Sequence, residues 1–354
     1  MTLRARIVGT GMYVPERVVT NADLEKRMDT SDEWIRQRSG IEERRWVEEG
    51  QTPADLAEQA ARRALASAEL DPGDVDCIVL GTLSPEAEFP GTSFFLQSRL
   101  GLQDTPSFDV RAQCSGFLYS LGIANSFVVS GQYRRVLVVG CEVHSTGIDV
   151  STEGRDVAVL FGDGAGAVVL EANDDPQDPS GILAVRLHAQ GKYARKLWTE
   201  LPGSAHYPSR ITPEMMAERR HFPTMDGKFV FKHAVTRMPE VLLEALDAAS
   251  VKKDDVDLFL FHQANLRINE FVANALELPP EKLRNNIQRY GNCSAAAIPM
   301  LLAEADAEGA LRRGQIVSLT AFGSGFSWPA PSCAGSGPSG LRAGSAPRCP
   351  RPSL

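Results

Sequence analysis

Short apolar runs alternate with longer segments of helical pattern along most of the chain. The runs are rich in Val, Ile and Leu, which is typical of buried strands. Between them, Ala-rich segments such as residues 55–70 and 239–250 carry apolar residues at helical spacing. This alternation predicts an α/β fold. The expected strands are Arg6 to Gly9, Cys77 to Leu80, Ser107 to Val110, Val136 to Gly140, Ala165 to Leu170, Leu258 to Phe261 and Ile316 to Thr320.

One helix–turn–strand pattern occurs twice. The letters AL-xx-A-xxxxx-DVD, followed by an apolar run, begin at Ala64 and again at Ala245. A single long-range echo of this kind indicates duplication rather than a short-period repeat. We therefore expect two similar halves, residues 1–172 and 181–328, joined by the polar stretch ANDDPQDPS at 172–180.

Residues 329–354 differ in composition from the rest of the chain. Pro, Ser and Gly make up 15 of these 26 residues, and no apolar periodicity is present. Such a segment buries too little surface to offset its ordering entropy, so we expect it to be disordered.

Composition and charge narrow the functional classes. The net charge of -8 argues against a general nucleic-acid binder or a polybasic membrane protein. No apolar stretch approaches the roughly 18 residues needed to span a bilayer, and the first residues do not resemble a secretory signal, so a cytoplasmic protein is expected. The six cysteines form no CxxC pairs or His/Cys clusters, which predicts neither a metal site nor a disulfide framework.

Cys114 is the sharpest candidate for chemistry. It lies in QCSGF, where an expected strand leads into a helix rich in small residues. Backbone N–H groups and the positive end of the helix dipole favour a thiolate there, which makes Cys114 a candidate nucleophile. A small buried cysteine is the alternative.

Three further segments could complete a site. His262 in FHQAN follows the strand of the second half, where it could act as a base or a hydrogen-bond donor. Asn292 in GNCSAA could donate to an oxyanion, and the turn FGSGF around Ser324 could aim a backbone N–H at a carbonyl. Each has a structural alternative: a buried histidine, a helix N-cap and a tight turn.

The glycine-rich segment at 162–166, GDGAG, lacks the helix and the acidic residue of a dinucleotide-binding unit. We therefore reject a dinucleotide site. The chain also contains no P-loop, HExxH or GxSxG motif.

Cys114, His262 and Asn292, in this order and spacing, resemble the Cys-His-Asn set of the 3-oxoacyl-acyl-carrier-protein synthase III family within the thiolase superfamily. The resemblance extends over TSDEWI at 30–35, SGI at 39–41, FGDGAG at 161–166, NLRI at 265–268 and AFGSGFSW at 321–328. It implies a five-layer αβαβα fold of two duplicated halves, and a homodimer.

The resemblance also implies a reaction. The cysteine takes an acyl group from acyl-CoA, and a malonyl group on acyl carrier protein then loses carbon dioxide and attacks the acyl-enzyme, which initiates fatty-acid synthesis. Acyl-CoA and malonyl-carrier are substrates, and no cofactor is implied. Backbone N–H groups of Cys114 and Ser324 would hold the oxyanion, and His262 and Asn292 would stabilise the enolate of the malonyl thioester. We expect the last two side chains to matter more for condensation than for loading.

Binding residues are implied in the same way. Trp34 and Arg155 would enclose the adenine of CoA. Arg38 would meet its phosphates, Gly227 and Asn265 would meet the pantetheine arm, and Phe89 would line the acyl pocket. Arg267 and Lys232 would form the basic patch that binds acidic carrier protein.

The chain departs from the family pattern at three places. Cys293 replaces a small hydroxyl residue, and His233 stands where an apolar residue is commoner. At the end, the expected strand is replaced by PAPSCAGSG after Trp328. Because proline has no N–H for a ladder, we expect this stretch not to form a central strand, and stability to suffer.

The altered ending suggests a shift of reading frame. With suitable codons, one extra G after the Trp328 codon would give Trp-Ala-Ser-Ala-Leu-Leu-Arg-Arg-Leu-Trp, which is close to the family ending. We infer such a shift, and the nucleotide sequence would test it.

Two alternatives stay open. One is an acyltransferase or condensing enzyme of a secondary-metabolite pathway, and the other is an impaired, carrier-binding homologue that results from the altered end. A relationship to HMG-CoA synthases is weaker, because Leu83 follows Gly81-Thr82 where those enzymes have Glu.

Overall fold

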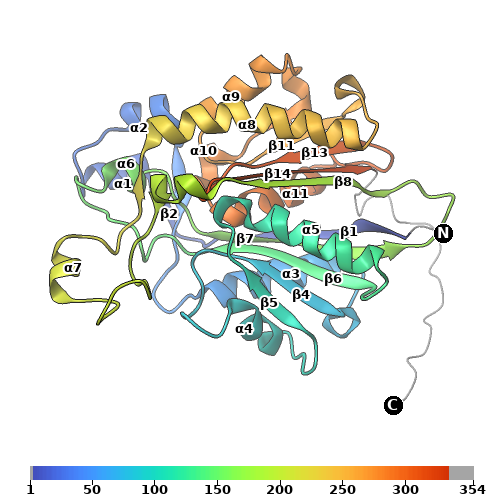
Figure 1. Ribbon diagram of the computed structural model, residues 1–354, viewed down its shortest axis with the longest axis horizontal. Coiled ribbons are helices and arrows are strands. Elements are labelled where there is room, and N and C mark those ends of the chain that lie inside the picture. The colour runs from blue at the N-terminus through green and yellow to red at the C-terminus, as the bar shows by residue number, and fades with distance from the viewer. Residues whose placement is uncertain (1–2, 335–354) are drawn as a thin grey trace.

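The computed structural model describes residues 3–334, which form two five-stranded sheets separated and covered by helices (Figure 1). The first sheet has the order β1-β7-β6-β4-β5 and the second β12-β11-β13-β14-β8. The strands of the first are β1 (Arg4–Tyr13), β4 (Cys77–Gly81), β5 (Ser107–Val110), β6 (Arg135–Glu142) and β7 (Gly164–Asn173). Those of the second are β8 (Gly181–Ala189), β11 (Leu258–Phe261), β12 (Leu283–Arg284), β13 (Ile316–Thr320) and β14 (Ser327–Ala334).

The helices complete five layers. Figure 1 shows α3 (Pro53–Ser67) and α4 (Thr92–Arg99) outside the first sheet, and α8 (Gly227–Ala248) and α9 (Leu266–Ala275) outside the second. Between the sheets lie α5 (Gly116–Val129) and α11 (Ala297–Ala307). The five-layer αβαβα fold expected from the resemblance is confirmed.

The shorter elements lie around these layers. They are the helices α1 (Asn21–Glu25), α2 (Asp32–Ser39), α6 (Arg155–Ala158), α7 (Pro213–Ala217) and α10 (Ile287–Tyr290), with the strand pairs β2–β3 (Val18–Thr20, Glu43–Arg45) and β9–β10 (Leu197–Trp198, Thr224–Met225).

The two sheets repeat one topology. Read from one edge, β1-β7-β6-β4-β5 corresponds to β8-β14-β13-β11-β12, with the same parallel and antiparallel neighbours. The repeated sequence pattern is α3 leading into β4 and α8 leading into β11. Duplication also makes the segment between β5 and α5 the counterpart of the segment between β12 and α11, which includes α10. These segments carry Cys114 and Asn292.

Local sequence sets where the main helices begin. Thr52 caps α3 in a reciprocal capping box with Asp55, and Pro53 occupies the first turn, where its missing N–H costs nothing. The helix α8 begins at Gly227, twelve residues before the start expected from the pattern, and contains Pro239 in its interior. Its N-cap is Asp226, which accepts from the N–H of Phe229.

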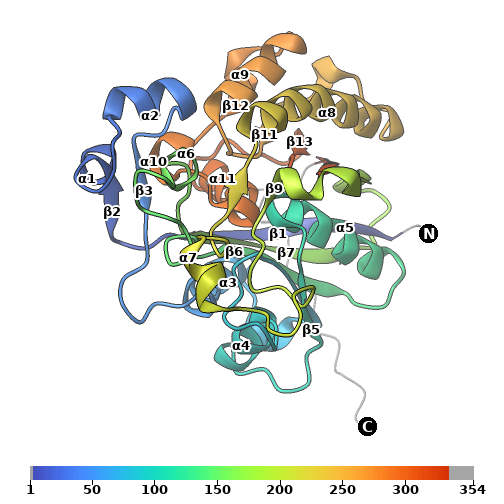
Figure 2. The same cartoon turned by 60° about the vertical axis from the view of Figure 1, so that its left-hand side comes forward.

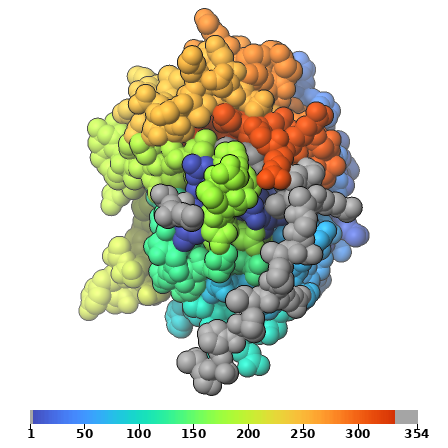
Figure 3. All heavy atoms as spheres, turned by 90° about the vertical axis from the view of Figure 1, so that its right-hand side faces the viewer, coloured from blue at the N-terminus to red at the C-terminus, as the bar shows by residue number. Residues whose placement is uncertain are grey.

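The junction between the halves lies on the surface. Residues 174–177 are exposed, and Figure 3 shows this light-green stretch beside the dark-blue start of β1. Arg6 of β1 forms an ion pair with Asp178 at 3.0 Å, which fastens the junction to the first sheet.

The expectation of disorder from residue 329 is wrong for residues 329–334. These residues belong to β14, which lies between β13 and β8 in the second sheet. The remaining residues of that expectation, 335–354, lie outside the described residues.

Strand geometry explains how β14 accommodates two prolines. The carbonyl of Pro329 accepts from the N–H of Ala321, so this residue faces the side of β13. By the alternation of a strand, Pro331 faces the same side. On that side, β13 pairs only with Ser332 to Ala334. Pro329 and Pro331 lie outside this paired stretch, so their missing N–H groups cost no hydrogen bond of the ladder. Pairing with β8 runs along the whole of β14.

Candidate active site

Cys114 lies in η2 (Gln113–Ser115), a 3-10 turn that leads from β5 into α5. Its counterpart in the second half is η6 (Ser294–Ala296), which leads into α11. Both turns begin with a residue in the left-handed region, Gln113 at φ 44 and Ser294 at φ 47. Strained backbone of this kind clusters at functional sites.

The two turns meet between the sheets. The Cys114 sulfur lies 3.3 Å from the hydroxyl oxygen of Ser294, which is 1% exposed. Ser294 lies within the GNCSAA segment, and local sequence does not single it out as a site residue. The equivalence of the two duplicated loops is the signal that could have found it.

The expected thiolate is not supported. The pKa of Cys114 is raised to about 11, mainly by burial and in a smaller part by the nearby Glu142 carboxyl. The Ser294 hydroxyl and the backbone N–H groups of Cys114 and Ser324 lower this pKa, but burial dominates. Cys114 is therefore a thiol near neutral pH, and its proton must leave during reaction.

The turn after β13 approaches the sulfur from the second half. A Cβ atom at Gly323 would lie 3.0 Å from the Cβ of Cys114 and 3.1 Å from the N of Ser115. Glycine therefore permits the close approach that brings the Ser324 N–H to the sulfur. The Ser324 hydroxyl itself donates to the carbonyl of Leu197, so its backbone is the group available at the site.

Asn292 is held with its amide in a defined orientation. Its side-chain oxygen accepts from the N–H of Ser294 at 2.8 Å, which leaves its NH₂ group to donate elsewhere. Its main chain is tied to the first half, because its N–H donates to Leu160 and its carbonyl accepts from Gly162. The residue is 5% exposed.

His262 stands at the end of β11. Its N–H donates to the carbonyl of Thr320 at 2.8 Å, so it leaves the sheet at the same edge as the turn that contacts Cys114. The residue is 2% exposed, and neither ring nitrogen has a hydrogen-bond partner among the described residues. Burial lowers the pKa of His262 to about 4, so its imidazole is neutral at pH 7.

Glu142, which the sequence did not single out, joins the halves beside this site. This fully buried carboxyl at the end of β6 accepts from Leu83, Ser84 and the N–H of Ala295 in η6. Burial raises the pKa of Glu142 to about 7. The residue positions η6 against the first sheet.

Trp34, Arg38 and Arg155 are brought together as expected. The guanidinium of Arg38 lies 4.3 Å and that of Arg155 4.9 Å from the centre of the Trp34 ring. They come from α2 and α6, which Figures 1 and 2 place at the same end of the molecule. The arrangement places two cations close to one aromatic ring.

The other predicted binding residues lie on or beside the outer helices of the second half. Asn265 caps α9 and donates to the carbonyl of Arg38 at 2.8 Å, which links it to the Trp34 cluster. Gly227 is the first residue of α8. Lys232 is exposed on α8, and Arg267 is exposed on α9. The guanidinium carbon of Arg267 lies 5.9 Å from the centre of the Phe231 ring.

Phe89 does not line an enclosed pocket of its own chain. It is 82% exposed, between β4 and α4. Within residues 3–334 this ring is left uncovered, so the role of Phe89 in an acyl pocket stays a prediction.

The two departures within the family segments have structural roles. Cys293 is 1% exposed, packs with Ala296 and Met300, and donates to the carbonyl of Tyr290. His233 bonds the carbonyl of Phe229 at 2.9 Å and stacks on its ring.

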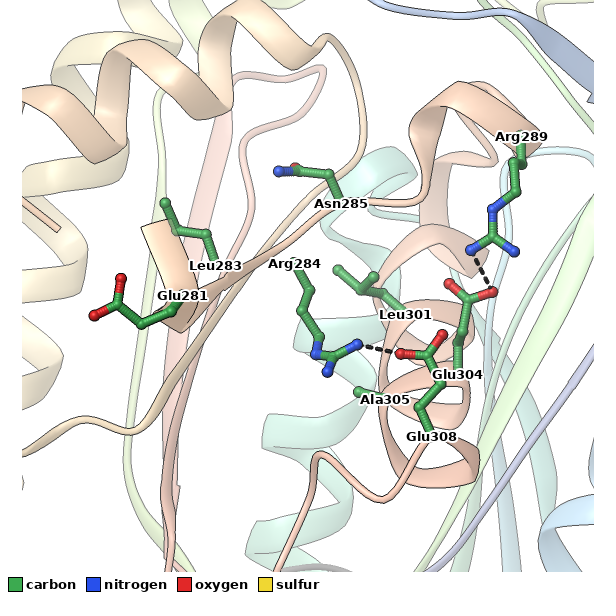
Figure 4. Close-up of a pocket in the computed structure, with 9 residues that line it drawn as sticks. All are labelled: Glu281, Leu283, Arg284, Asn285, Arg289, Leu301, Glu304, Ala305 and Glu308. Carbon is green, nitrogen blue, oxygen red and sulfur yellow. Dashed lines mark hydrogen bonds and ion pairs between the residues drawn. The ribbon is translucent and has the colours of Figure 1, made fainter. Parts of the chain in front are cut away.

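A cavity of about 290 Å³ lies elsewhere, beside β12 and α11 (Figure 4). Four of its five charged side chains form two ion pairs, Arg284 with Glu308 and Arg289 with Glu304, and Glu281 lies apart from both pairs. None of the predicted catalytic residues lines it. Within residues 3–334, no cluster of three His, Cys, Asp or Glu side chains is suited to a metal ion, and no helix is long and apolar enough to cross a membrane.

The fold and this site define a condensing acyltransferase of the thiolase superfamily. The sequence pattern of 3-oxoacyl-acyl-carrier-protein synthase III matches residues 108–191, and that of its C-terminal part matches residues 246–332. Beta-ketoacyl-acyl-carrier-protein synthase III of Alkalilimnicola ehrlichii is 44% identical over 327 residues, which cover 92% of this chain and 97% of that protein. The chain belongs to the 3-oxoacyl-acyl-carrier-protein synthase III family.

Solved structures agree with this assignment. The crystal structure of 3-oxoacyl-acyl-carrier-protein synthase III from Aquifex aeolicus matches with a TM-score of 0.85 and 43% identity, covering 93% of this chain and 99% of that one. A priming beta-ketosynthase of a polyketide biosynthetic pathway matches with a TM-score of 0.86 but 32% identity, covering 95% and 98%. The higher identity favours the initiating condensation of fatty-acid synthesis over a secondary pathway.

Proposed function

We propose that this chain condenses an acyl-CoA primer with malonyl-acyl-carrier-protein to give a 3-oxoacyl-carrier product. The observation that carries the proposal is the meeting of Cys114 with the segment of Asn292 and Ser294, between the two halves. The relatives named for this activity supply the substrate classes.

Loading is the first half-reaction. The Cys114 sulfur attacks the thioester carbonyl of acyl-CoA, and the S–C bond to CoA breaks. CoA leaves as a thiol, so the proton lost by Cys114 is balanced by the one that CoA gains. The N–H groups of Cys114 and Ser324, both close to the sulfur, support an oxyanion hole for the tetrahedral intermediate.

Condensation follows on the loaded enzyme. The malonyl thioester loses carbon dioxide, and its α-carbon attacks the acyl carbonyl. The C–C bond forms, the S–C bond to Cys114 breaks, and the sulfur takes one proton from solvent to return to the thiol. The neutral imidazole of His262 and the NH₂ of Asn292 are suited to donate to the thioester oxygen as it becomes an enolate.

The binding surfaces follow from charge and stacking. The aromatic and cationic group of Trp34, Arg38 and Arg155 suits the adenine and phosphates of CoA. Gly227 and Asn265 would border the pantetheine arm, and exposed Lys232 and Arg267 would attract acidic carrier protein.

The assembly and setting are proposed on the same basis. The chain would act as a homodimer in the cytoplasm and would need no cofactor, because acyl-CoA and malonyl-carrier are substrates. Exposed large apolar side chains, including Phe89 and Phe94 beside the edge strand β5, support a dimer face.

The test is a two-stage mass measurement. Purified protein is incubated with acetyl-CoA, and the mass added to the Cys114 peptide is read. Malonyl-carrier is then added, and the 3-oxoacyl-carrier is sought. Absence of an acyl adduct on Cys114 with acetyl-CoA and with a panel of longer acyl-CoAs would refute the function, whereas an adduct without a condensed product would restrict the protein to acyl transfer.

A further inference from the structure

His144 carries a buried imidazole that has no part in the proposed mechanism. It lies two residues after Glu142, beyond the end of β6, and is 6% exposed. Its main chain is fixed, because its N–H donates to the Asp163 carboxylate at 2.7 Å. Its Nε2 atom is enclosed and has no hydrogen-bond partner among residues 3–334.

The surroundings of His144 are those of the active site. Its ring lies 4.5 Å from that of Phe161, centre to centre. Phe161 forms a backbone bridge with Asn292, so the imidazole packs on the segment that holds the catalytic carboxamide. His262 is close enough that it adds to the effect of burial in lowering the pKa of His144 to about 3.

The two imidazoles leave three buried ring nitrogens unpaired: both of His262 and the Nε2 of His144. An unpaired buried polar atom costs about 1–3 kcal/mol, and most such atoms in proteins have a partner. In the proposed reaction, the enolate oxygen would accept a hydrogen bond from His262. No group of that reaction pairs with the Nε2 of His144, which indicates that a further polar group on the substrate does so.

We propose that His144 determines primer specificity by hydrogen-bonding a hydroxyl group on the acyl chain that Cys114 carries. A hydroxyl fits because it both donates and accepts, so either neutral imidazole tautomer can pair with it. A carboxylate fits poorly, because the neutral ring offers no compensating charge and the buried acids Asp163 and Glu142 lie nearby. This inference rests on the proposed acyl loading of Cys114.

The expected selectivity has a physical basis. A site that hydrogen-bonds a substrate hydroxyl discriminates against the analogue without it, because its own polar atom is then left unpaired. We expect the hydroxylated primer to load at least about tenfold better in kcat/KM than the unsubstituted chain of equal length.

The experiment compares loading of the Cys114 peptide by butanoyl-CoA with loading by its 2-, 3- and 4-hydroxy derivatives. The wild-type chain should prefer at least one hydroxy isomer. His144→Leu should lose that preference and His144→Gln, which keeps a donor and an acceptor, should retain part of it. His206→Leu, in a loop where His206 faces Glu200, is the matched control and should leave the preference unchanged.

Three results would overturn the inference: preference of the wild-type chain for butanoyl-CoA over every isomer, equal loading of all four, or a hydroxyl preference that survives in His144→Leu. If His144→Leu does not fold by circular dichroism, His144→Met takes its place under the same criteria. Failure of every acyl-CoA, including acetyl-CoA, to load Cys114 would instead refute the proposed function, so the two failures are distinguishable.

Discussion

The sulfur of Cys114 lies 3.3 Å from the hydroxyl oxygen of Ser294, although 180 residues separate them along the chain. Each residue belongs to a 3-10 turn in one of the duplicated halves, and the turns are structural counterparts. A hydroxyl at this distance can donate to the sulfur as it becomes a thiolate.

Removal of this hydroxyl should slow ionisation of Cys114. Because burial holds the pKa of Cys114 near 11, alkylation by iodoacetamide should rise about tenfold per pH unit between pH 7 and 10. Ser294→Ala should be slower at every pH in this range, since a contact that lowers the pKa is lost. Peptide mapping of the Cys114 adduct gives the rates.

Ser126→Ala is the control for Ser294→Ala. Ser126 lies on α5, the helix that follows Cys114, and donates only to the carbonyl of Gly122. Identical profiles for Ser294→Ala and the wild-type chain would show that the hydroxyl has no electrostatic role.

Cys114→Ala should receive no acyl group from acyl-CoA. Cys293→Ala should still be acylated, because Cys293 is buried among Ala296 and Met300 and burial holds its pKa well above the ordinary value. Intact-mass measurement with acetyl-CoA checks both variants. An acyl adduct of unchanged rate on Cys114→Ala would assign the nucleophile to another residue.

His262→Ala and Asn292→Ala should separate the two half-reactions. Each removes one donor to the enolate, so condensation should fall about 10²- to 10³-fold while loading keeps much of its rate. Single-turnover loading and carrier-product formation are measured on the same samples. Equal losses in both steps would contradict the assigned roles.

The Glu142 carboxyl should make stability depend on pH. Its folded pKa of about 7 lies above the ordinary value of 4.5, so the folded state keeps a proton that the unfolded state loses. Stability from this group is therefore full below pH 4.5 and declines as pH rises to 7, by about 3 kcal/mol.

Urea unfolding of the wild-type chain and Glu142→Gln at pH 5 and 8 tests this dependence. The contributions of buried His144 and His262 to this pH dependence have the opposite sign, since burial lowers their pKa values. Both histidines are present in both proteins, so their contributions cancel in the difference. The stability of Glu142→Gln relative to the wild-type chain should rise between pH 5 and 8. A difference that does not change with pH would show that Glu142 titrates normally.

Strand β14 should be essential to the second half. Ala330 is fully buried and packs with Val241 and Ala245 of α8. Ala330→Asp places a charge in this contact, which typically costs several kcal/mol. Leu243→Asp, on the exposed face of the same helix, should change the free energy of unfolding by much less. Equal effects in thermal or urea unfolding would mean that β14 does not hold α8 in solution.

The strands and the duplication were predictable because each depends on local pattern. Short apolar runs gave β4, β5, β6, β11 and β13, and the repeat beginning at Ala64 and Ala245 gave the equivalence of the sheets. β14 was missed because the cost of a proline depends on which way its absent N–H faces, and only the register with β13 and β8 determines that.

The site was predictable only where it depends on local sequence. Motif positions located Cys114 and the Asn292 loop, but the dipole argument for a thiolate left out desolvation, which decides the pKa of Cys114. His144 and Glu142 carry no local signal, because their importance comes from which segments the sheets bring around them. The exposure of Phe89 could not be predicted from its sequence position, since exposure is a property of the whole surface.

Glu142 has a consequence for the evolution of the duplicated fold. Its carboxyl accepts a hydrogen bond from the N–H of Ala295. At Gly140 of β6 the backbones approach closely, because a Cβ there would lie 2.2 Å from the carbonyl oxygen of Ala295. These two contacts fix the turn η6 against the first sheet. Ala295 is the positional counterpart of Cys114. The turn of the first half therefore carries the reactive sulfur, and the equivalent turn of the second half is held rigidly beside it. The two halves share one topology but have different roles in the site.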